Sequence, residues 1–153
     1  MFRGTILLID RFSSMNTLIN SYLTASGFVV ECVRSLSELG AIRLNTVHLA
    51  LLDIGTAGDK LNSVLSQMKA AGVPVIVLTS ESDYSGRLTA LELGAADVMS
   101  RPLDIAELVA RIRAAQARTQ VSVSGFDRPP ASFGGLLVDI SKYHAELDGE
   151  PLN

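Results

Sequence analysis

Three runs of aliphatic residues constrain the fold of this chain more than any other feature of its sequence. Residues 6–9, 49–52 and 75–78 are apolar throughout and lack the alternation of apolar and polar residues that marks a strand with one wet face. Continuous runs of this kind are typical of parallel strands that are covered by helices on both faces of a sheet. The sequence therefore predicts an α/β fold.

Strand-like and helix-like segments alternate over about the first 118 residues, which indicates a series of βα units. Strands are predicted at residues 5–10, 28–33, 48–53, 74–79 and 96–100. Helices are predicted after Ser13 and Ser14, near 36–44, along 61–68, near 84–93 and from Asp104 onward. We expect a doubly wound, five-stranded parallel sheet with the flavodoxin-like strand order 2-1-3-4-5.

The first predicted helix has apolar residues at helical spacing, and we expect them to face the sheet as one stripe. They are Met15, Leu18, Ile19, Tyr22 and Leu23. Cys32 is the chain's one cysteine and lies in the second predicted strand. Since it has no second thiol and no metal-ligand pattern around it, we interpret it as a small core residue.

Composition limits the partners that this chain is expected to have. The 153 residues carry a net charge of −3, so the chain as a whole has no basic excess of the kind that binds nucleic acid. No signal peptide is evident, and no apolar run is long enough to cross a bilayer. A soluble, cytoplasmic protein without membrane contact is the expectation.

The last 35 residues differ in composition from the rest. Residues 119–132 lack helical or strand periodicity and contain Asp-Arg-Pro-Pro, so they are interpreted as a linker after a first domain at 1–118. Within residues 133–153, two short strands and an Asp148-Gly149 turn predict a β-hairpin. An isolated hairpin is marginally stable, so it is expected to dock, to pair or to belong to a larger domain.

Polar residues stand at the carboxyl ends of four predicted strands. Asp10, Asp53 and Thr79 end three of them, and Arg101 ends the fifth, directly before Pro102. In open parallel sheets, ligands bind beyond these strand ends, where the strand order reverses. Two carboxylates, a hydroxyl and a guanidinium are therefore expected to converge on one site.

These residues lie in motifs that resemble the receiver domain of two-component response regulators. The motifs are Leu7-Leu8-Ile9-Asp10, Leu51-Leu52-Asp53, Val77-Leu78-Thr79-Ser80, and Gly94-Ala95-Ala96-Asp97 through Arg101-Pro102-Leu103. The resemblance implies a regulator that is not an enzyme, with Asp53 as the residue that accepts phosphate from a histidine kinase. It also implies a magnesium ion, switch positions at Thr79 and Val98, a lysine position held by Arg101, and a cis-proline at Pro102.

The chain departs from the family pattern in its acidic pocket. Arg11 replaces the second of two adjacent acids, and Arg101 replaces the lysine. Asp10 and Asp53 together with these two arginines sum to zero formal charge, which removes the electrostatic reason for magnesium to bind. We therefore expect no cofactor and an ion pair from Arg11 or Arg101 to Asp53. The alternative is that Arg11 points to solvent. In that case Asp53 can still be phosphorylated, and a bound magnesium ion is expected.

Further motifs resemble the OmpR/PhoB subfamily, whose members form symmetric dimers through helix 4, strand 5 and helix 5. The matching positions are Arg87, Asp97, Glu107 and Arg111. Glu107 and Arg111 are also four residues apart on one predicted helix, where an ordinary surface pair is the alternative. Residues 133–153 resemble the first hairpin of a winged-helix domain without its recognition helix, so DNA contact is expected only through a C-terminal domain absent from these residues.

Three functions remain open from the sequence. The first is a regulatory domain of a transcription factor that acts by dimerisation and not by phosphorylation. The second is a conventional phosphorelay receiver with Asp53 as acceptor. The third is a flavodoxin-like enzyme or cofactor-binding protein, since fold does not fix function. Against the third, the turn after the first strand has no glycine-rich phosphate cradle, and no catalytic cluster is apparent.

Overall fold

The computed structural model describes residues 3–124, 131–133, 136–139, 144–147 and 150–151. It divides into two compact units, Met1–Gln116 and Ala117–Asn153, which are described one at a time. No helix among the described residues combines the length and the apolar character that a membrane span needs.

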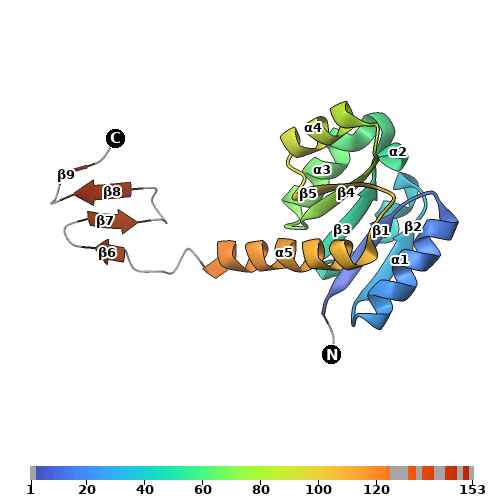
Figure 1. The fold of residues 1–153 in the computed structure, drawn as a ribbon, viewed down its shortest axis with the longest axis horizontal. Helices are drawn as coiled ribbons and strands as arrows, with labels where there is room; N and C mark the ends of the chain where they lie inside the picture. Colours follow the sequence, from blue (N-terminus) through green and yellow to red (C-terminus); the bar gives the residue numbers. More distant parts are fainter. Residues whose placement is uncertain (1–2, 125–130, 134–135, 140–143, 148–149, 152–153) are drawn as a thin grey trace. The chain divides into compact units, whose positions relative to one another are not determined.

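The first unit is built on a parallel sheet of five strands in the order β2-β1-β3-β4-β5 (Figure 1). The strands are β1 (Thr5–Ile9), β2 (Val29–Val33), β3 (Leu49–Asp53), β4 (Val75–Ser80) and β5 (Asp97–Arg101). Each agrees with its predicted position to within one residue. The predicted fold class and strand order are confirmed, and the carboxyl ends of all five strands lie at one edge of the sheet.

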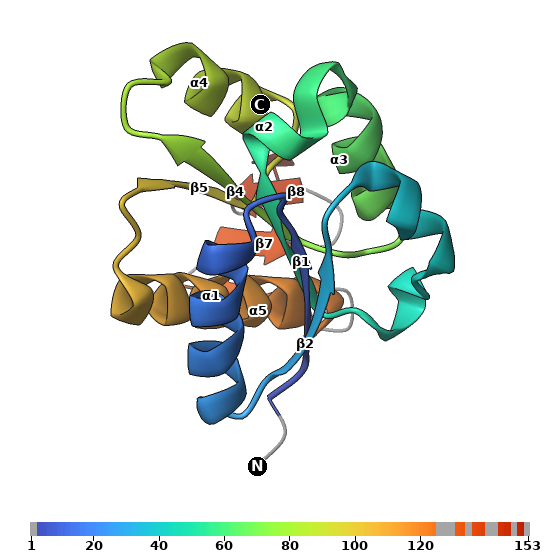
Figure 2. The same ribbon diagram turned by 90° about the vertical axis from the view of Figure 1, so that its right-hand side faces the viewer.

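Helices cover both faces of this sheet (Figure 2). The α-helices are α1 (Ser13–Ala25), α2 (Ile54–Ala57), α3 (Leu61–Ala70), α4 (Tyr84–Glu92) and α5 (Ile105–Ser124). Helices α1 and α5 lie on one face, and α2, α3 and α4 lie on the other. Three short 3₁₀-helices complete the unit: η1 (Leu36–Ala41), η2 (Leu44–Thr46) and η3 (Gly58–Lys60). Two of these replace the α-helix predicted near 36–44.

The strands place alternate residues in two separate cores. In β1, Ile6 and Leu8 pack with α1 and α5, whereas Leu7 and Ile9 pack on the opposite side with α3. All five residues of β3 are buried, as expected for a central strand. Edge strand β2 is different, because only Val33 of its five residues is buried. Cys32 is exposed there, so its prediction as a core residue is wrong.

Helix α1 buries a narrower stripe than predicted. Ile19 and Leu23 are fully buried, but Leu18 and Tyr22 are 55% and 44% exposed. The apolar residues of α1 span more of the helix circumference than the sheet can cover, and Leu18 and Tyr22 lie on the uncovered part. The helix also begins earlier than expected, with Phe12 rather than a serine as its N-cap residue.

The second unit extends the predicted hairpin. Helix α5 continues to Ser124, so residues 119–124 of the predicted linker are helical. Beyond it, the strands β6 (Ala131–Phe133), β7 (Leu136–Asp139), β8 (His144–Leu147) and β9 (Glu150–Pro151) form an antiparallel sheet in chain order. The Asp148-Gly149 turn lies outside the described residues. The winged-helix identity of this unit stays a prediction.

Candidate functional site

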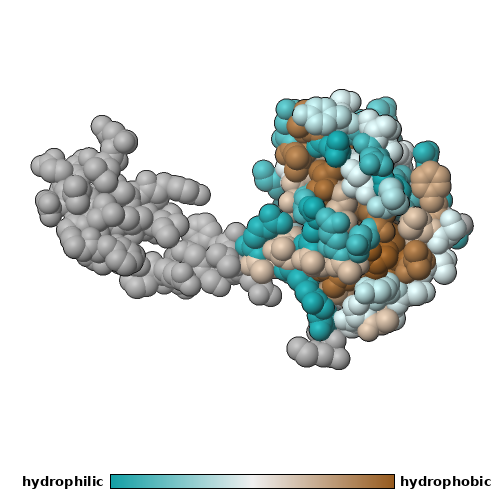
Figure 3. Space-filling model, viewed as in Figure 1, coloured by the Kyte–Doolittle hydropathy of each residue, from teal (hydrophilic) through white to brown (hydrophobic). Residues whose placement is uncertain are grey.

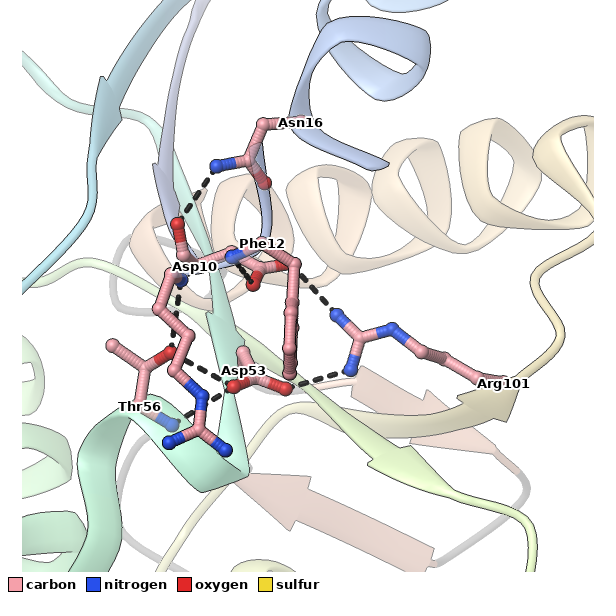
Figure 4. Close-up of polar contacts among 7 residues, drawn as sticks. Asp10, Phe12, Asn16, Asp53, Thr56 and Arg101 are labelled. Carbon is pink, nitrogen blue, oxygen red and sulfur yellow. Dashed lines mark hydrogen bonds and ion pairs between the residues drawn. The ribbon is translucent and has the colours of Figure 1, made fainter. Parts of the chain in front are cut away.

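The candidate site lies at the carboxyl ends of β1, β3 and β5, where three charged side chains meet (Figure 4). Asp10 directly follows β1, Asp53 is the last residue of β3, and Arg101 is the last residue of β5. The three strands are parallel members of one sheet, so their ends lie at the same edge although they are up to 91 residues apart in the chain.

Asp53 is held by the turn that follows its strand. The residue is 2% exposed and caps the N-terminus of α2. Its Oδ2 accepts hydrogen bonds from the backbone N–H and from the hydroxyl of Thr56, each at 2.8 Å. Asp53 and Thr56 are an N-cap residue and its partner three positions on, a spacing that fixes the carboxylate rotamer. Sequence reasoning missed Thr56, although this capping spacing was visible in the chain.

Asp10 is fully buried and is fixed by the start of α1. Its Oδ1 accepts the backbone N–H of Phe12 at 2.9 Å, and its main-chain carbonyl accepts from Asn16 Nδ2 at 2.7 Å. Burial raises the pKa of Asp10 above its ordinary value of 3.8, while the Phe12 N–H and the charge of Arg101 act in the opposite direction. Neither Phe12 nor Asn16 was recognised from the sequence, because each acts through local backbone geometry.

Arg101 joins the two carboxylates. Its Nη1 lies 2.6 Å from Asp53 Oδ1 and its Nη2 lies 2.7 Å from Asp10 Oδ2. The guanidinium fork thus spans two aspartates from different strands, with one short, charge-assisted hydrogen bond to each. The side chain of Arg101 is 22% exposed and those of the aspartates are nearly or fully buried, so both ion pairs are largely shielded from water.

The carboxylate oxygens at this site are engaged by groups of the protein itself. All four carboxylate oxygens of Asp10 and Asp53 already accept hydrogen bonds, from Phe12, Thr56 and Arg101. A guanidinium lies against one oxygen of each carboxylate, at the place where a cation bound between the two acids would lie. Among the described residues, no group of three or more acidic, histidine or cysteine side chains is arranged to hold a metal.

Arg11 does not pair with Asp53. Its backbone N–H donates to the Thr56 hydroxyl at 3.1 Å, and its guanidinium lies 5.0 Å from the centre of the Phe12 ring. A methyl group added at Gly55 would lie 3.1 Å from Arg11 Nη2 and 3.3 Å from Asp53 Oδ2. The Arg11 guanidinium therefore lies over Gly55, beside the aspartate site and not within it.

The remaining predicted site residues lie around this centre. Thr79 is fully buried next to Leu78, which is paired in register with Asp53, and its hydroxyl has no hydrogen-bond partner among the described residues. Val98 is partly buried and packs against the core on the α3 side. The peptide bond between Arg101 and Pro102 is cis.

Three of the four residues predicted for the dimer surface, Asp97, Glu107 and Arg111, pair with one another within the chain. Arg111 Nη1 lies 2.9 Å from both carboxylate oxygens of Asp97, and its Nε and Nη2 contact Glu107 at 3.0 and 2.8 Å. These hydrogen bonds raise the pKa of Arg111, and the bond to Glu107 has a larger effect than the bond to Asp97. Arg87 contacts no acid but donates to Ser100 Oγ at 3.4 Å.

A comparison with family models matches residues 6–113 to the response regulator receiver domain. Two similar curated proteins are the phosphate regulon transcriptional regulatory protein PhoB of Pseudomonas aeruginosa and the TorCAD operon transcriptional regulatory protein TorR of Escherichia coli. Each is 30% identical to this chain, over 99% and 96% of it respectively. The chain spans 67% of the first relative and 66% of the second.

Solved structures show the same fold. The receiver domain of the TMAO respiratory system response regulator TorR superposes with a TM-score of 0.70 at 30% identity, covering 76% of this chain and 98% of that domain. Full-length FixJ from B. japonicum also gives a TM-score of 0.70, at 23% identity, covering 82% of this chain and 64% of that protein. The second likeness concerns the fold alone.

Proposed function

Since this chain belongs to the response regulator receiver domain family, we propose that it is the regulatory domain of a DNA-binding transcription regulator and acts through dimerisation, without phosphorylation. The similar curated proteins are named as transcriptional regulators, which supports a role in transcription. In this proposal DNA contact belongs to a C-terminal domain, and a histidine kinase is not required as a partner.

The Arg101 bridge is the observation that carries the proposal of phosphate independence. A carboxylate acts as a nucleophile through a free oxygen lone pair. Asp53 Oδ1 is instead held at 2.6 Å by Arg101, and Oδ2 accepts two hydrogen bonds from Thr56. Three donors thus lie against the two oxygens, and the guanidinium stands in front of Oδ1, where a phosphoryl donor would have to approach.

Electrostatics support the same proposal. The Arg101 cation already offsets one of the two negative charges of Asp10 and Asp53, and Arg11 lies alongside over Gly55. A magnesium ion would have to displace a bidentate, partly buried cation and would then be repelled by it at short range. Binding of magnesium is therefore disfavoured, and with it the shielding that phosphoryl transfer to a carboxylate requires.

The surface of α4 supports dimerisation. Tyr84, Leu88 and Leu91 are 65%, 44% and 49% exposed, and their spacing places them on one side of the helix. Brown, hydrophobic surface is visible over the α4 region in Figure 3. Exposed apolar side chains grouped on one helix are typical of protein interfaces, and a symmetric pair of chains is the commonest way to cover them.

Intact-mass spectrometry after incubation with magnesium and acetyl phosphate tests phosphate independence. We expect the wild-type chain to gain no phosphoryl group, because Arg101 is paired with the Asp53 carboxylate. The double variant Arg11→Asp/Arg101→Lys restores the third acid and the lysine and is expected to gain one, which Asp53→Asn should abolish. A phosphoryl group on the wild-type chain that is lost in Asp53→Asn would overturn the proposal.

One observation favours a second function, a conventional phosphorelay receiver that accepts phosphate at Asp53 with magnesium bound. The buried Thr79 hydroxyl lies one residue beyond the β4 partner of Asp53 and has no described hydrogen-bond partner. An acyl phosphate on Asp53 would supply an acceptor oxygen for such a hydroxyl. The same mass measurement separates the two functions, because only this one predicts a phosphorylated wild-type chain.

A further inference from the structure

An open, shallow cavity with a basic lining lies beside the aspartate site, at the carboxyl ends of β1, β2 and β3. Its volume is about 410 Å³. Its polar lining comes from three places in the chain: Arg11 after β1, Arg34 and Ser35 after β2, and Thr56, Asp59 and Lys60 after β3. The cavity thus borders the position where the strand order of the sheet reverses, which is the usual location for ligands in this fold class.

The cations of this lining are unpaired. Arg11, Arg34 and Lys60 carry three positive charges against the single negative charge of Asp59, and none of the three forms an ion pair with another described residue. This contrasts with Arg101 and Arg111, whose guanidinium groups each pair with two carboxylates. Three cations along the lining of one surface depression create a positive potential that attracts anions.

Size and charge together indicate the chemistry of the ligand. A volume of about 410 Å³ lies within the range of pockets that hold small organic molecules. The net lining charge of +2 matches a phosphate monoester, which carries close to two negative charges near neutral pH and has three acceptor oxygens. Arg11 and Arg34 offer planar donor forks for these oxygens.

We propose that this cavity binds a small phosphorylated organic molecule. Such a ligand would act on the aspartate site through Thr56, which lines the cavity and also donates both hydrogen bonds to Asp53 Oδ2. The Arg11 side chain provides a second connection, because it lies over Gly55 next to Asp53. This site does not depend on the proposed dimerisation or on the phosphorylation state of Asp53.

Two probes test the proposal: ribose 5-phosphate and inorganic pyrophosphate, each titrated at constant ionic strength with calorimetry and amide NMR. We expect saturable binding, with the largest shifts at the amides of Arg34, Ser35 and residues 55–60. The double variant Arg34→Ala/Lys60→Ala should bind each probe at least about tenfold more weakly, because each removes a charged hydrogen-bond donor.

The matched control is Lys69→Ala, which removes an exposed cation of α3 that does not line the cavity. It should bind both probes as the wild type does. Melting temperatures of all variants report whether the fold is kept, and the exposed positions of Arg34 and Lys60 predict that it is. Absence of saturable binding would overturn the proposal, as would binding that Arg34→Ala/Lys60→Ala leaves unchanged or shifts that centre on Asp53 and Thr79.

Discussion

At the scale of single residues, Arg101 governs the chemistry of the site. Two buried carboxylates from separate strands share its guanidinium, so neither acid is left as an unpaired buried charge. The planar fork of the arginine suits this arrangement, because Nη1 reaches Asp53 while Nη2 reaches Asp10. We therefore expect the residue at this position to influence both the stability of the pocket and its response to metal ions.

Removing the Arg101 side chain tests this role. Arg101→Ala should lower the free energy of unfolding by about 3 kcal/mol, because it leaves Asp10 and Asp53 buried without their cation. Magnesium should then raise the melting temperature of the variant but not that of the wild type, since only the variant presents free carboxylate oxygens. Thermal melts followed by circular dichroism, with and without magnesium, measure both effects.

Arg113→Ala is the control for this variant, because Arg113 is an exposed cation on α5 and has no role in the site. Its stability should stay within about 0.5 kcal/mol of the wild type, and magnesium should leave it unchanged. Equal stability of Arg101→Ala and Arg113→Ala would contradict the structural role given to the bridge. Stabilisation of the wild type by magnesium would contradict the proposed metal independence.

At the scale of secondary-structure elements, the sheet covers only part of the apolar surface of α1. Ile19 and Leu23 pack against the sheet, while Leu18 and Tyr22 remain at the surface. Ile19→Ala should cost about 3 kcal/mol of unfolding free energy, because it leaves a cavity in a close-packed core. Leu18→Ala removes a side chain of similar size from the surface and should change stability by no more than about 0.5 kcal/mol.

Urea unfolding of the two α1 variants measures this difference directly. The comparison is matched, because both residues are aliphatic, adjacent in the chain and within the same helix. Equal destabilisation by Leu18→Ala and Ile19→Ala would contradict the structure. It would mean that Leu18 is buried against the sheet, as the sequence predicts.

At the scale of the whole molecule, the proposed dimer makes use of α4. Sedimentation at micromolar concentration should show a dimer, because Tyr84, Leu88 and Leu91 expose a shared apolar side of that helix. Leu88→Asp should shift the equilibrium to monomer by burying an unpaired charge in the interface. Glu107→Lys should have the same direction of effect, since it reverses a charge next to Arg111.

Leu18→Asp is the matched control for the dimer, because it places the same charge on an exposed leucine of α1, on the other face of the sheet. This variant should sediment as the wild type does. A wild-type chain that remains monomeric at these concentrations would contradict the proposal. Equal dissociation of the dimer by Leu18→Asp and Leu88→Asp would show that α4 is not the interface.

The sheet of this protein was predictable from sequence. Central parallel strands are buried on both faces, so their residues are aliphatic without interruption. The short helices were less predictable. The segment near 36–44 forms 3₁₀-helices instead of the predicted α-helix, and the first of them begins with a capping box at Ser35 and Glu38. Cys32 was misplaced because its exposure depends on β2 being an edge strand, which is a property of the sheet and not of the segment.

For the candidate site, the sequence by itself determined which chemical groups stand at the strand ends, because a polar residue directly after a buried strand must lie at that edge of the sheet. It left open whether Arg11 or Arg101 meets Asp53. Only the tertiary structure decided this, since β5 brings Arg101 to both aspartates from 48 and 91 residues away. Arg11 is adjacent to Asp10 in the chain, but its side chain lies over Gly55 and lines the neighbouring cavity.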